Sequence, residues 1–133
     1  MPDWQNWYRM AIDSQQAAQE LQSFRLRSCA SRIYYSAYQA VTSVLLYRGL
    51  APPVGQEAWS HVTTPELIVE HWGPLMASID KRKDLAKRLG GLYKLRISAD
   101  YVGDDIVSAP IVARAMKDGN FLVRVVAGIL PKE

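Results

Sequence analysis

The sequence predicts an all-α fold: an up-and-down antiparallel bundle of four to five helices, in a single domain that spans residues 1–133. Apolar residues recur at spacings of three and four almost throughout the chain. No alternating polar and apolar pattern runs longer than about four residues, which argues against strands. Proline and glycine clusters leave only short connections between the periodic segments, and short connections favour antiparallel neighbours.

Two helices are predicted in the first third of the chain, over about residues 3–22 and 26–47. Asp3 can cap the first of them, and Gly49 is at a position where helices commonly stop. The apolar stripe of the first comprises Trp4, Trp7, Ala11, Ala18 and Leu21. The apolar face of the second is rich in small residues, and comprises Ala30, Ile33, Ala37, Ala40, Val41, Val44 and Leu45. Tyr34, Tyr35 and Tyr38 crowd its middle, a pattern that suits packing more often than base stacking.

The middle of the chain is more interrupted. Residues 50–55 predict a loop by their proline and glycine content. Thr64 is expected to cap a short helix that opens at Pro65 and ends at Gly73. A fourth helix is expected from Leu75 or Asp80 to Ala99, and residues 100–105 break the helical pattern.

The last predicted helix starts after Pro110, with Ser108 as its cap, and continues to about Ile129. Gly119 lies in its middle, where glycine weakens an exposed helix by roughly 1 kcal/mol relative to alanine. Residues 130–133 form a tail.

Composition narrows the class of protein but names no function. Hydrophobic residues make up 49% of the chain and charged residues 22%, as in an ordered globular domain. No segment reaches the roughly 18 apolar residues of a membrane span, and no secretory signal is evident, so we expect no membrane association. Cys29 is the only cysteine, which excludes an internal disulfide and favours a reducing, cytoplasmic location. The net charge of +3 permits an RNA or nucleotide partner without requiring one.

Arg96 is the most informative candidate for a functional side chain. It continues the apolar stripe of Leu85, Leu89 and Leu92, so we expect it to point toward the core or an interface. A buried guanidinium costs several kcal/mol unless it is paired, and Asp100, four residues later, can supply the partner. Two interpretations stay open: a structural Arg96–Asp100 pair, or an arginine placed for a phosphate, which its planar fork suits.

The remaining polar residues give weaker signals. Lys83, Lys87 and Lys94 share the outer face of the fourth helix, either as a solvated surface or as a contact for a nucleic-acid backbone. His61 and His71 are ten residues apart with no cysteine nearby, a poor metal pair. We therefore expect no metal or other cofactor, and a surface role for His61.

Two segments resemble a prokaryotic branch of the HEPN family. The stretch Ala-Ser-Arg-Ile-Tyr-Tyr-Ser-Ala-Tyr at residues 30–38, followed by Leu45, Leu46 and Gly49, resembles that branch's A-x-R-x-Y-Y-A-x-F…LL…G pattern. Residues 92–101 are similar to its L-x-x-x-R-x-x-A-D-Y signature, with Arg96, Asp100 and Tyr101 at the matching places. His61 falls where members often carry a histidine. The resemblance extends from about residue 3 to 130.

The resemblance implies a HEPN-like bundle that forms a homodimer and brings two arginine motifs together. Many members are metal-independent endoribonucleases, often toxins encoded beside a small nucleotidyltransferase-like antitoxin. The catalytic candidates are then Arg96, Asp100 and Tyr101. Candidates for binding RNA or a nucleotide are Arg32, Tyr35 and Lys94.

The chain departs from the family's commonest motif, in which a histidine follows the arginine by four to six residues. Asp100 and Tyr101 stand there instead, and tyrosine, with an ordinary pKa near 10, is a poorer acid–base group at neutral pH than histidine. Three functions therefore stay open. They are a dimeric ribonuclease toxin, a non-catalytic nucleotide-, RNA- or protein-binding module paired with a nucleotidyltransferase-like partner, and a structural helical domain.

Overall fold

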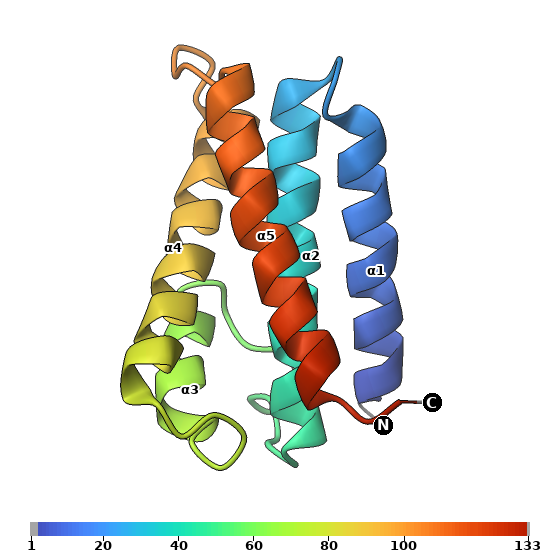
Figure 1. Ribbon diagram of the computed structural model, residues 1–133, viewed down its shortest axis with the longest axis vertical. Helices are drawn as coiled ribbons and strands as arrows, with labels where there is room; N and C mark the ends of the chain where they lie inside the picture. Colours follow the sequence, from blue (N-terminus) through green and yellow to red (C-terminus); the bar gives the residue numbers. More distant parts are fainter. Residues whose placement is uncertain (1–2, 133) are drawn as a thin grey trace.

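Five helices make up the part of the chain that the computed structural model describes, residues 3–132 (Figure 1). No strand occurs within that range, so the all-α prediction is confirmed. The first two residues and the last residue of the predicted domain lie outside it. The helices are α1 (Trp4–Leu21), α2 (Leu26–Tyr47), α3 (Thr64–His71), α4 (Ile79–Tyr101) and α5 (Ala109–Ile129).

The four long helices run alternately up and down, as the sequence predicts (Figure 1). Helix α2 is the centre of the bundle, since it contacts each of the other four. The short helix α3 lies beside the lower half of α4, in the connection that returns the chain from α2. None of the helices in the described part has the length and apolar character needed to span a bilayer.

The predicted helix ends are mostly confirmed by the capping contacts. A carboxylate oxygen of Asp3 accepts a hydrogen bond from the backbone N–H of Gln5 at 2.8 Å. The Ser108 hydroxyl accepts one from the N–H of Ile111, and Gly49 has a φ of +84° just after α2. The prediction that Thr64 caps the short helix is wrong: α3 begins at Thr64 itself, and the residue before it, Thr63, makes no side-chain capping bond.

The core forms around the small-residue face of α2. All seven apolar residues predicted for that face are fully buried. Gly119 of α5 packs so closely on it that a Cβ at this position would lie 2.3 Å from Cγ1 of Ile33. Gly119 is therefore a contact point between α2 and α5, and its absent side chain permits the close approach of the two helices.

The end of α4 corrects the prediction that the helical pattern breaks at Asp100. The helix continues through Asp100 and Tyr101. The guanidinium of Arg27, from α2, donates to five backbone carbonyl oxygens, those of Ser98, Ala99, Val102, Gly103 and Asp105, at 2.6–3.2 Å. The last carbonyls of a helix lack partners within the helix, and a cation is favourable there. Arg27 thus stabilises a helix end that lies two residues beyond the one that local sequence indicates.

Candidate functional site

Arg96 lies on the buried side of α4, as predicted, with 12% of its side chain exposed. Its Nε donates to the Asp100 carboxylate at 3.0 Å, one turn further along the helix. Its Nη2 donates to the hydroxyl oxygens of Tyr35 at 2.9 Å and of Tyr101 at 3.2 Å. The guanidinium is therefore held in one orientation by three side chains from two helices.

Asp100 is in turn fixed by α2, because the Ser31 hydroxyl donates to the same carboxylate oxygen at 3.1 Å. That oxygen therefore receives two hydrogen bonds. Two hydrogen bonds to one oxygen fix the orientation of the carboxylate. Asp100 is thus placed to position Arg96.

Tyr35 is close to two arginines. The Cζ atoms of Arg32 and Arg96 are 5.1 and 5.2 Å from the centre of its ring. Both guanidinium groups are within cation–π distance of the same Tyr35 ring. Among the described residues Asp100 pairs with Arg96, and no carboxylate pairs with Arg32. The immediate surroundings of Tyr35 therefore carry an excess of one positive charge, a favourable environment for an anion.

His61 belongs to the same cluster, which corrects the expectation of a surface role. Its Nδ1 lies 2.5 Å from the hydroxyl of Tyr34, which is fully buried. Its ring stacks on that of Tyr93 with the centres 5.6 Å apart and 10° between the planes, and its centre is 5.9 Å from that of Tyr35. His61 and Arg96 are thus both within 6 Å of the Tyr35 ring, although 35 positions separate them in the sequence.

The loop that carries His61 is fixed from α2. The hydroxyl of Tyr38 donates to the backbone carbonyl of Trp59, two residues before His61. Ser60 accepts from the N–H of Thr63, which closes a turn around the histidine. The two buried tyrosines of α2 therefore position His61, Tyr34 through the imidazole ring and Tyr38 through the backbone of Trp59.

The surroundings of His61 favour the uncharged imidazole. Burial lowers the pKa of His61 from its ordinary value, and the positive charge of Arg96 lowers it further. Burial raises the pKa of the Tyr34 phenol well above its ordinary value, with the neighbouring tyrosines adding to the effect. At neutral pH the cluster thus holds a neutral imidazole beside a protonated phenol.

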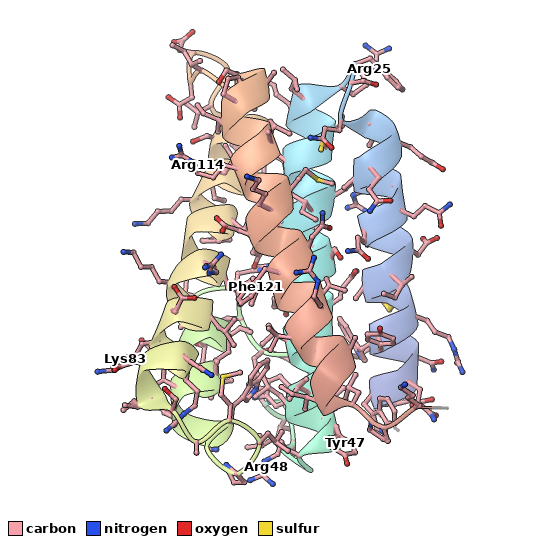
Figure 2. The ribbon with its side chains drawn as sticks, in the orientation of Figure 1. Arg25, Tyr47, Arg48, Lys83, Arg114 and Phe121 are labelled. Atoms are coloured by element: carbon pink, nitrogen blue, oxygen red, sulfur yellow. The ribbon has the colours of Figure 1, made fainter. Side chains whose placement is uncertain are left out.

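Lys94 lies apart from these residues. Positions two apart in an α-helix project on nearly opposite sides, so Lys94 and Arg96 face different ways. Lys94 is exposed and falls on the same outer stripe as Lys83, which projects away from the bundle (Figure 2). Five of the six predicted site residues therefore come together, namely Arg32, Tyr35, Arg96, Asp100 and Tyr101, and Lys94 does not.

A separate hollow of about 620 Å³ lies between α1 and the end of α5, lined mainly by apolar residues such as Trp4, Tyr8 and Leu130. None of the predicted site residues contributes to it. Over residues 3–132, no group of three or more His, Cys, Asp or Glu side chains is arranged to hold a metal ion.

The cluster of Arg32, Tyr35, His61, Arg96, Asp100 and Tyr101, hereafter the Arg96 site, combines hydrogen-bond donors, positive charge and aromatic surface. Such a combination suits the binding of a phosphate group attached to a stackable base. No family model matches the chain, and no curated protein matches it.

Proposed function

We propose that this protein is a HEPN-like, metal-independent endoribonuclease that acts as a homodimer, as the toxin of a toxin–antitoxin pair with a nucleotidyltransferase-like antitoxin. The observation that supports this most directly is the grouping of His61 and Arg96 around one tyrosine. The segment 92–101 has no histidine of its own. The loop before α3 supplies one from a different part of the chain.

In the proposed reaction, the 2′-hydroxyl of the RNA attacks the adjacent phosphorus, and the bond from phosphorus to the 5′ oxygen breaks. The products are a 2′,3′-cyclic phosphate and a free 5′-hydroxyl. Arg96 would bind the phosphoryl oxygens as negative charge develops on them, and preorganised donors of this kind contribute strongly to catalysis. Asp100 would hold Arg96, and the exposed Tyr101 would donate a hydrogen bond or stack on a base. A dimer would bring a second Arg96 to the same phosphate.

A second function is favoured by one specific observation. One carboxylate oxygen of Asp100 accepts from both Arg96 and Ser31, so this side chain is committed to holding Arg96 in place. A non-catalytic module that binds RNA or a nucleotide needs only the donors and the aromatic rings. Its partner would be the nucleotidyltransferase-like protein.

The two functions are separated by incubating the purified protein with total cellular RNA and tRNA in the presence of EDTA. Arg96→Ala should abolish cleavage while the helical content stays unchanged. Arg114→Ala is the matched control, because Arg114 is an exposed arginine of α5 (Figure 2) and has no hydrogen bond or ion pair with the described residues of the Arg96 site. Cleavage that survives Arg96→Ala would remove Arg96 from the mechanism. No cleavage by the folded wild type, together with nucleotide or RNA binding that Arg96→Ala abolishes, would support the binding module.

A further inference from the structure

The hydrogen bond between Tyr34 and His61 determines where the imidazole carries its proton. The Tyr34 side chain is fully buried, and a buried hydroxyl must donate its proton to an acceptor or lose the corresponding hydrogen bond. Among the described residues Nδ1 of His61, at 2.5 Å, is the acceptor within reach of that hydroxyl. The phenol therefore donates, and Nδ1 receives the bond with its lone pair.

A neutral imidazole has one protonated nitrogen, so accepting at Nδ1 places the proton on Nε2. The reverse arrangement would have Nδ1–H donate to the phenol oxygen. It would leave the Tyr34 proton without an acceptor inside the bundle, so the Nε2–H tautomer is favoured by roughly tenfold or more.

The Nε2 atom has no hydrogen-bond partner among the described residues, and the His61 side chain is only partly buried. Nε2–H is thus a donor that remains available. We propose that Tyr34 is a positioning residue that holds His61 in the Nε2–H tautomer, so that His61 meets a phosphate oxygen as a hydrogen-bond donor.

This role deepens the proposed ribonuclease function and, for its catalytic part, rests on it. With Nε2 protonated, the imidazole cannot take the proton of the attacking 2′-hydroxyl. That proton passes to hydroxide or water as the bond from O2′ to phosphorus forms, and the departing 5′ oxygen takes a proton from water. His61 and Arg96 then act together by stabilising the charged phosphoryl oxygens, through hydrogen bonds and charge.

The groups that face His61 support this assignment. Tyr34, Tyr35 and Tyr38 contact it from α2, and Tyr93 from α4. The one charged group that acts on it is Arg96, a cation that opposes protonation of the ring. No carboxylate among the described residues pairs with His61, so nothing nearby favours the imidazolium.

The tautomer is measured directly by long-range ¹H–¹⁵N correlation spectra of protein labelled with ¹⁵N-histidine. The expected pattern for His61 is a non-protonated Nδ1 and a protonated Nε2, with distinct chemical shifts. In Tyr34→Phe the two shifts should move toward each other as the tautomers exchange, and the pKa of His61 should rise because the bond that favoured the neutral ring is lost. Tyr93→Phe is the matched control, since Tyr93 stacks on the ring and makes no hydrogen bond to it. It should leave the tautomer unchanged.

A wild-type His61 protonated at Nδ1, or a tautomer that Tyr34→Phe does not alter, would overturn the proposal. These spectra need no RNA, so they test Tyr34 even if the protein cleaves nothing. If it does cleave RNA, the rate should rise steadily with pH through the neutral range. A bell-shaped profile with a limb at the NMR-measured pKa of His61 would show that His61 exchanges a proton with the substrate, and would refute the donor role.

Discussion

Gly119→Ala should destabilise the protein, although alanine is the better helix former. In an exposed helix this change would contribute up to about 1 kcal/mol of stability. Here the new methyl carbon would lie 2.3 Å from Cγ1 and 2.6 Å from Cδ1 of Ile33. Carbon atoms in contact prefer about 3.5–4.0 Å, so the two side chains would have to separate by more than 1 Å.

Ile33 has little freedom to make room. It is fully buried, and a β-branched side chain in a helix has one strongly preferred rotamer. Overpacking of this kind typically costs about 1–3 kcal/mol. After subtraction of a gain of about 1 kcal/mol in helix propensity, we expect a net loss of up to about 2 kcal/mol in the free energy of unfolding, which corresponds to a fall in Tm of several degrees.

The assay is urea unfolding followed by circular dichroism, with glycines of α4 as controls. A methyl group at Gly90 or Gly91 would meet nothing within 4 Å, so Gly90→Ala and Gly91→Ala should each stabilise, by up to about 1 kcal/mol. In Ile33→Ala with Gly119→Ala, the second change should cost less than it does alone, because the clashing atoms are gone. If Gly119→Ala stabilises the protein as much as Gly90→Ala, the inference that Ile33 leaves no room for a methyl group at position 119 is wrong.

Three further predictions concern the Arg96 site and the core. Arg32→Ala should weaken RNA binding by several-fold and Lys94→Ala much less, because Arg32 lies near the Tyr35 ring together with Arg96, whereas Lys94 faces away. Filter binding at one salt concentration compares the two variants, and equal losses of affinity would contradict this placement. Since the pKa of His61 is lower in the folded than in the unfolded chain, protonation favours unfolding. Its contribution to stability is fully present above about pH 6.5 and is lost as the pH falls toward the lowered pKa, so His61→Gln should flatten the fall in urea midpoint between pH 7.5 and pH 5. Cys29 is fully buried and burial raises the pKa of its thiol, so it should react with a thiol reagent only as the protein unfolds. Rapid reaction in native buffer would show that the core around Cys29 opens without global unfolding.

The fold could be predicted largely because its signals are local. The apolar period fixes the long helices, and Asp3, Gly49 and Ser108 act within a few residues of the ends that they mark. The end of α4 could not be placed in this way. The carbonyls of Ala99 and Val102 accept hydrogen bonds from Arg27, which precedes them by more than 70 residues.

The residues of the candidate site likewise differ in whether their places follow from local sequence or from long-range contacts. Arg96 and Asp100 are one helical turn apart, so their pairing follows from the spacing. His61 lies in a loop without periodicity, and its burial depends on contacts with Tyr34 and Tyr38 that only the folded chain brings about. The one sequence signal for it was the position of a histidine in the family that the chain resembles. Lys94 does not join the cluster because positions two apart in a helix project on nearly opposite sides, and its candidacy for RNA binding stays a prediction.

The contacts of Arg27 have a consequence for how the chain can vary. All five of its hydrogen bonds at the end of α4 are made to backbone carbonyls, and every residue type carries that group. One distant side chain therefore helps to hold the path of the α4–α5 connection through groups that do not depend on residue identity. We infer that substitutions over residues 102–105 are tolerated during sequence drift, whereas a change in the length of that segment is not. The connection thus offers a place to introduce labels or new side chains beside the Arg96 site without redesigning the bundle.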